Sequence, residues 1–98
     1  MISKTPAKKG GTTKVTFELP AEYGGGQVCL CGEFNSWAPD ATPMTKRKDG
    51  RFSTTVTLQQ GQSYRYRYLV DGERWVDDPE PDEYVYDGYG SKDSVVVL

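Results

Sequence analysis

Histidine is absent from this sequence of 98 residues. Its absence excludes Ser-His-Asp and Cys-His catalysis, histidine-ligated metal sites and a side chain that titrates near neutral pH. A basic excess is missing too, because the formal net charge is −2 and the isoelectric point is near 5.0. A nucleic-acid-binding protein usually carries a basic surface. We therefore expect neither histidine-dependent catalysis nor a nucleic-acid partner.

Long apolar runs and cysteines are also scarce. No segment approaches the roughly 18 apolar residues of a membrane span, and the start of the chain lacks the apolar core of a signal peptide. On a strand, Cys29 and Cys31 would point the same way with Cβ atoms about 7 Å apart, whereas a disulfide needs about 4 Å. The pair does not complete a tetrahedral zinc site either. These features predict a cytoplasmic protein without membrane contact, metal or cofactor.

Short β-strand patterns fill most of the sequence. Apolar and polar residues alternate with a period of two, which is typical of half-buried strands. We expect such strands over residues 14–19, 27–33, 44–46, 51–58, 63–70, 74–76 and 94–98. No segment shows helical periodicity. About seven short antiparallel strands with frequent turns predict an all-β fold, an immunoglobulin-like β-sandwich.

The chain divides into a tail and one domain. Residues 1–13 are basic and rich in glycine and threonine, so we expect a flexible N-terminal tail. Residues 14–98 have the size of a single domain. Within it, the glycines at 24–26 are expected to join the first two strands into a hairpin, and the Asp-Gly pairs at 49–50 and 71–72 mark further turns.

Acidic side chains are concentrated between residues 77 and 90. Such groups can supply a carboxylate pair for glycoside hydrolysis or ligands for calcium. Their spacing matches no calcium-binding loop, and a chain this short offers no deep cleft in which to raise the pKa of an acid. We expect a solvated loop here, and a protein that is not an enzyme.

Two tryptophans occupy polar surroundings that do not resemble a core. Trp37 lies in a loop rich in Asn, Ser and Pro, and Trp75 lies beside a tight turn. An indole offers a flat apolar surface that matches the C–H face of a pyranose. Arg67 alternates with Tyr66 and Tyr68, so we assign the tyrosines to the core and the guanidinium to the opposite face, where it can bind hydroxyl oxygens. The alternative is that both indoles cover the sandwich edge and that Arg67 is solvated.

An ordered set of motifs resembles a known family. The segments are Leu30-Cys-Gly-Glu-Phe-Asn-Ser-Trp37, Leu58-x-x-Gly61-x-x-Tyr64-x-Tyr66-x-Tyr68-x-Val70-Asp71-Gly72 and Trp75 to Pro79. Together they resemble the starch- and glycogen-binding modules at the front of isoamylases and branching enzymes and in the β subunit of AMP-activated protein kinase. The resemblance covers about Val15 to Leu98 and implies an immunoglobulin-like sandwich that binds α-glucan without cleaving it.

The resemblance also implies a binding site. Trp37 and Trp75 would be the stacking rings, and Arg67 stands where the kinase module has a lysine. The late contact loop would contribute Tyr89, Ser91 and Asp93. Position 93 is commonly an asparagine in the family, so the sequence here departs from the pattern.

The expected partner is an α-glucan, as glycogen, starch or a maltooligosaccharide, together with a glycogen-metabolising enzyme. The rival interpretation is a protein-interaction or regulatory module on the same scaffold, with little or no affinity for glucan.

Overall fold

Nine strands and two short 3-10 helices make up the part of the chain that the computed structural model describes, which is residues 1–6, 10–86, 88 and 92–98. The strands are β1 (Ile2–Pro6), β2 (Thr12–Leu19), β3 (Val28–Gly32), β4 (Thr45–Lys46), β5 (Phe52–Gln59), β6 (Ser63–Val70), β7 (Arg74–Val76), β8 (Glu83–Tyr86) and β9 (Lys92–Val97). The 3-10 helices are η1 (Ala21–Tyr23) and η2 (Glu33–Asn35). No helix in the described ranges is long and apolar enough to cross a membrane.

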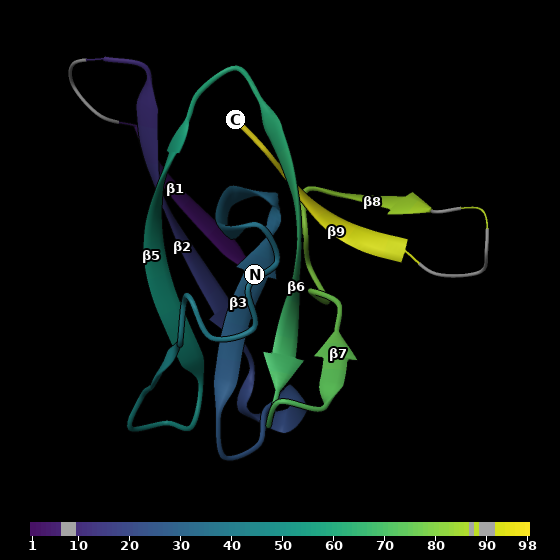
Figure 1. Ribbon diagram of the computed structural model, residues 1–98. Coiled ribbons are helices and arrows are strands. Elements are labelled where there is room, and N and C mark those ends of the chain that lie inside the picture. Colours follow the sequence, from purple (N-terminus) through teal and green to yellow (C-terminus); the bar gives the residue numbers. More distant parts are fainter. Residues whose placement is uncertain (7–9, 87, 89–91) are drawn as a thin grey trace.

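The strands form two antiparallel sheets that face each other (Figure 1). The first sheet has the order β1-β2-β5-β4, and the second has the order β3-β6-β9-β8, with β7 paired to β6 beside this path. The all-β sandwich predicted from the sequence is confirmed.

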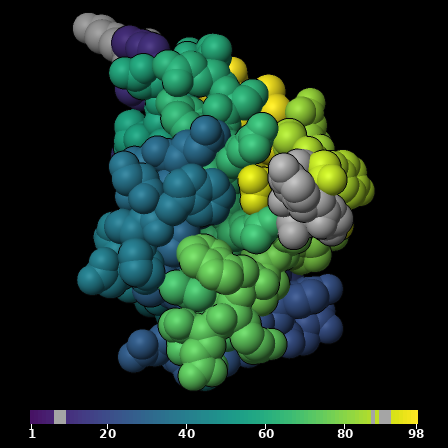
Figure 2. All heavy atoms as spheres, turned by 45° about the vertical axis from the view of Figure 1, so that its right-hand side comes forward, coloured from purple at the N-terminus to yellow at the C-terminus, as the bar shows by residue number. Residues whose placement is uncertain are grey.

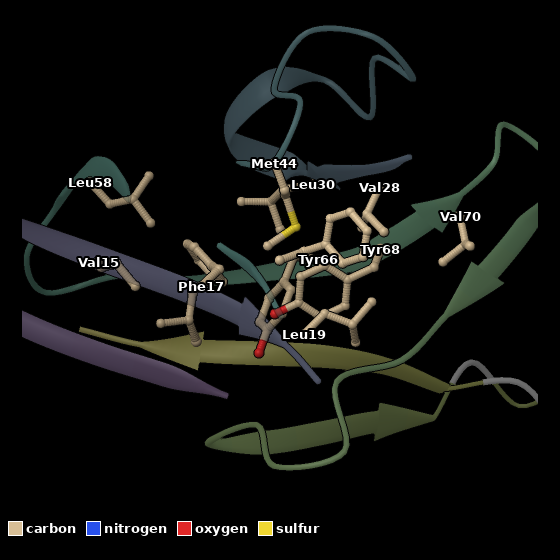
Figure 3. Close-up of a cluster of buried hydrophobic side chains, with 12 residues drawn as sticks. Val15, Phe17, Leu19, Val28, Leu30, Met44, Leu58, Tyr66, Tyr68 and Val70 are labelled. Atoms are coloured by element: carbon tan, nitrogen blue, oxygen red, sulfur yellow. The ribbon is translucent and has the colours of Figure 1, made fainter. Parts of the chain in front are cut away.

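The core lies between the two sheets and follows from the alternation of apolar residues (Figure 3). Its buried members are Val15, Phe17, Leu19, Val28, Leu30, Met44, Phe52, Leu58, Tyr66, Tyr68, Val70 and Val96. The Phe17 and Tyr66 rings meet edge to face with centroids 4.9 Å apart. Each such side chain contributes about 1.5–3 kcal/mol when fully buried. The prediction that Tyr66 and Tyr68 belong to the core is confirmed.

The predicted hairpin between residues 14–19 and 27–33 is wrong. Strand β2 pairs with β1 and β5, whereas β3 pairs with β6 in the other sheet. Both strands have an apolar face, and both faces become buried when the strands lie across the core from each other. The glycines serve close packing instead: a Cβ at Gly24 would lie 2.5 Å from the Phe52 ring, and one at Gly25 would lie 2.1 Å from the Asp71 carboxylate.

Residues 2–6 also differ from the expected flexible tail, because they form β1. This strand pairs with β2 from Ile2 opposite Phe17 to Pro6 opposite Thr13, and β2 itself begins at Thr12. Only Ile2 packs against the core. Segment 2–6 therefore lacks the alternation that marks a half-buried strand, and its pairing with β2 is a tertiary effect.

The acidic segment is not simply a solvated loop. It contains β8, and its Asp78 side chain is fully buried. The hydroxyls of Tyr66 and Tyr68 donate to Asp78 Oδ2 at 2.6 and 3.2 Å, and the amino group of Met1 contacts Oδ1. Burial raises the pKa of both tyrosines well above its usual value, so both remain hydrogen-bond donors. A carboxylate in the core is tolerable because it is paired with such donors.

The two cysteines are free thiols on β3. Cys31 is buried, and this burial together with the neighbouring Cys29 raises its pKa to about 11. At pH 8 only about one Cys31 in a thousand is then a thiolate, the form that attacks a thiol reagent.

We expect the reagent DTNB to modify the more exposed Cys29 much faster than Cys31 in the folded chain at pH 8, with Cys31 reacting after unfolding in urea. The single variants Cys29→Ser and Cys31→Ser assign each reaction to its thiol. Two equally fast reactions in the absence of urea would show that Cys31 is accessible.

Candidate functional site

Four side chains singled out in the sequence meet on the outer face of the second sheet. Trp37 follows η2, Arg67 lies on β6, Trp75 on β7 and Asp93 on β9. Together they line one cavity of about 340 Å³. Figure 2 looks onto this side of the molecule, where the segment around residue 37 (blue) and the segment around β7 (light green) stand on either side of a hollow. Residues distant in the sequence thus form one surface.

Arg67 lies where the neighbour of β6 changes. Strand β9 pairs with the first half of β6 and β7 pairs with the second half, and Arg67 falls between the two. Its guanidinium therefore reaches one carboxylate from each side. Arg67 Nε is 2.8 Å from Asp93 Oδ1 on β9 and 3.3 Å from Asp77 Oδ1, directly after β7. Arg67 Nη2 also donates to the backbone oxygen of Lys92.

The cluster of Arg67, Asp77 and Asp93 is half-buried and carries one positive and two negative charges. Its side chains are 24, 28 and 20% exposed. Burial raises the pKa of Asp77 above its usual value, although Arg67 and Lys92 oppose the shift. Among the described residues that line the cavity, Arg67 is the one cation, and it is already paired with two carboxylates; Arg65 Nη1 also lies 3.8 Å from Asp93 Oδ2. Cations paired in this way are poorly suited to an anionic ligand. The cavity suits a neutral ligand with hydroxyl groups.

The two indoles are held in different ways. Trp75 is 49% exposed on β7, and its cross-strand neighbour Leu69 is 6% exposed. Trp37 is half-buried and has a φ of 59°, a left-handed conformation that is a genuine outlier for a bulky residue. The loop fixes this conformation, because Trp37 N donates to Gly32 O at 2.9 Å and Asn35 Nδ2 donates to Leu30 O at 2.9 Å. Such strain persists only where the surroundings hold it, and it is frequent at ligand-binding sites.

The structure can be compared with the site residues that the sequence predicts. The structure brings Trp37, Arg67, Trp75 and Asp93 together. Tyr89 and Ser91 lie outside the described residues. Asp77 joins the cluster, although the acidic composition of its segment predicts a solvated loop. The sequence does contain a signal for Asp77: it follows Trp75 by two residues, and residues two apart in an extended chain lie on the same face.

A second cavity is lined by charged side chains. It measures about 360 Å³, lies beside the turn between β4 and β5, and is lined by Glu18, Arg47, Lys48, Asp49 and Arg51. None of the described residues that line it is aromatic. Among the described residues, no group of three or more Cys, Asp or Glu side chains is placed to hold a metal ion. Compared with this cavity, the one between the indoles is the better candidate for a sugar.

Comparison with known proteins identifies the family. The model of a family described as the glycogen recognition site of AMP-activated protein kinase matches residues 13–97. The chain is 39% identical over 57 residues to the 1,4-alpha-glucan branching enzyme GlgB of Aquifex aeolicus (strain VF5), which is 55% of this chain and 9% of the enzyme. It is also 39% identical over 56 residues to the 5'-AMP-activated protein kinase subunit beta-1 of Sus scrofa, which is 57% of this chain and 42% of the subunit.

The chain thus spans less than half the length of either relative. The family match, in contrast, extends over both sheets, from β2 to the end of β9. This chain belongs to the family of glycogen recognition domains described for AMP-activated protein kinase.

Proposed function

We propose that this domain binds α-glucan without cleaving it, by stacking sugar rings on Trp37 and Trp75. The observation that carries the proposal is the single cavity that both indoles border together with Arg67 and Asp93. The indoles offer apolar plates to the C–H faces of glucose units, and the charged pair offers donors and acceptors to the hydroxyls. The family match supports glucan as the sugar.

The size of the cavity fits a short stretch of polymer. At about 340 Å³ it is near the lower end of small-molecule sites, which run from about 300 to 1,000 Å³. Such a site binds a few consecutive glucose units and leaves the rest of a glycogen or starch chain in solvent. A soluble maltooligosaccharide therefore fills the site as completely as the polymer.

The geometry of the acids supports binding rather than hydrolysis. Asp77 and Asp93 both approach the same atom, Arg67 Nε, from neighbouring strands. Glycosidases instead place two carboxyl groups on either side of the bond that breaks. We also propose that the domain brings a glycogen-metabolising enzyme to its polymer in the cytoplasm, a reducing compartment that suits its free thiols.

Co-sedimentation tests the proposed function. The chain is expected to pellet with insoluble amylose, to be released by maltoheptaose, and to stay in solution with cellulose. Incubation with glycogen is expected to produce no new reducing ends. Retention on neither polymer would reject glucan binding and favour the rival interpretation, a protein-interaction module.

We expect the affinity for maltoheptaose to be nearly independent of salt. The ligand is neutral, so binding releases no counterions and involves no intermolecular ion pair that salt could screen. Between roughly 0.05 and 0.5 M NaCl the dissociation constant should change by less than about twofold. An affinity that collapses at high salt would indicate a charged partner.

A further inference from the structure

Asp77 and Asp78 follow each other at the end of β7 but serve opposite sides of the second sheet. Asp78 points into the core, where it accepts hydrogen bonds from Tyr66 and Tyr68. Asp77 lies on the outer side, with Oδ1 3.3 Å from Arg67 Nε. This is the alternation expected of an extended chain.

Strand β7 needs such anchors because it is short and carries Trp75. It has three residues, and its described pairing is with β6 alone, ending at Val76 opposite Tyr68. The pairing of β9 with β6 ends at Ser94 opposite Tyr66. Between these two points, the described charged contacts on the outer face run from Asp77 through Arg67 to Asp93. This chain of contacts connects the end of β7 to β9.

We propose that Asp77 is a positioning residue of the sugar site: it holds the Arg67 guanidinium and the end of β7, so that Arg67 and Trp75 face the same ligand. The inference rests on the proposed glucan-binding function. Asp77 acts through its neighbours, because it does not line the cavity and its Oδ1 atom is buried.

The contribution of Asp77 to ligand binding is expected to differ from its contribution to the stability of the fold. An arginine side chain has many rotamers, and holding it in one of them before binding reduces the entropy lost when the ligand arrives. Burying the Asp77 carboxylate is itself unfavourable, as its raised pKa indicates even with Arg67 and Lys92 nearby and Asp93 adding repulsion. Neutralising Asp77 should therefore weaken binding without weakening the fold.

A double-mutant cycle tests the proposal, with maltoheptaose affinity measured by calorimetry and stability by urea unfolding. Asp77→Asn is expected to lower affinity about three- to tenfold and to leave the urea midpoint unchanged or higher. In the Arg67→Ala background, the same change should have no further effect on affinity. The matched control is Glu73→Gln, which removes a negative charge from the exposed turn before β7 and should bind like the wild type.

Three results would overturn the inference while glucan binding stands. The first is that the Asp77→Asn variant binds maltoheptaose as tightly as the wild type does. The second is that Asp77→Asn lowers affinity just as much in the Arg67→Ala background. The third is that the loss of affinity comes with an equal loss of stability. A wild type that binds no glucan overturns the proposed function itself, and the positioning role with it.

Discussion

Replacing Asp78 by alanine is expected to lower the free energy of unfolding by about 3–5 kcal/mol. The carboxylate is fully buried and accepts hydrogen bonds from the Tyr66 and Tyr68 hydroxyls. Its removal leaves both hydroxyls in the core without this partner, and each unsatisfied group costs about 1–3 kcal/mol. Urea unfolding followed by tryptophan emission measures the change. The loss is large beside the total stability of an ordinary domain, about 5–15 kcal/mol.

The preceding residue provides the control. Asp77→Ala removes a carboxylate from a half-exposed ion pair and should change stability by less than about 1 kcal/mol. Tyr66→Phe removes the donor of the 2.6 Å hydrogen bond and should cost about 1.5–3 kcal/mol. If Asp78→Ala were no more destabilising than Asp77→Ala, the buried cluster would not support the core as described.

Replacing Trp75 or Trp37 by alanine should weaken maltoheptaose binding by about 1–3 kcal/mol each, the range found when nucleic-acid bases stack on aromatic residues. This corresponds to roughly a 5- to 150-fold loss of affinity, since about 1.4 kcal/mol is tenfold. The physical reason is the loss of one of the two apolar plates that border the cavity among the described residues. Calorimetric titration measures the effect.

The fold of each tryptophan variant must be checked, because either ring can also protect the sheet. For Trp75, 49% exposed on an edge strand, the urea midpoint should stay close to that of the wild type. For Trp37, with a φ of 59°, the second variant Trp37→Gly removes the ring while relieving the backbone. Stable variants with unchanged affinity would reject the stacking role, and loss of folding would identify that ring as a cover for the sheet.

The sequence predicts the strands well where one face of each is buried and poorly elsewhere. The alternation around Phe17, Leu30 and Tyr66 shows which side chains face inward. It does not show which sheet a strand joins, so the hairpin over segments 14–19 and 27–33 was a wrong prediction. Strands β1 and β8 have little buried apolar surface and depend on the strand beside them, information that a local pattern does not contain.

Some residues of the site can likewise be predicted from the local sequence, and others cannot. Trp37 and Trp75 stand out because large rings in polar segments are unusual, and Arg67 because it alternates with core tyrosines. Asp78 could not be predicted, since its hydrogen-bond donors lie on another strand and an acidic run indicates a solvated segment. The contact of Asp93 with Arg67 depends on the register of β9, which only the structure supplies.

The central claim is that both indoles contact the glucan, and one spectroscopic titration tests it directly. The sequence contains two tryptophans, so a ¹H–¹⁵N correlation spectrum of the labelled chain has two indole signals, which Trp37→Phe and Trp75→Phe assign. With added maltoheptaose, both signals are expected to shift and saturate together, whereas cellohexaose should leave them in place. Indole signals that stay fixed while the chain is retained on amylose would contradict the account.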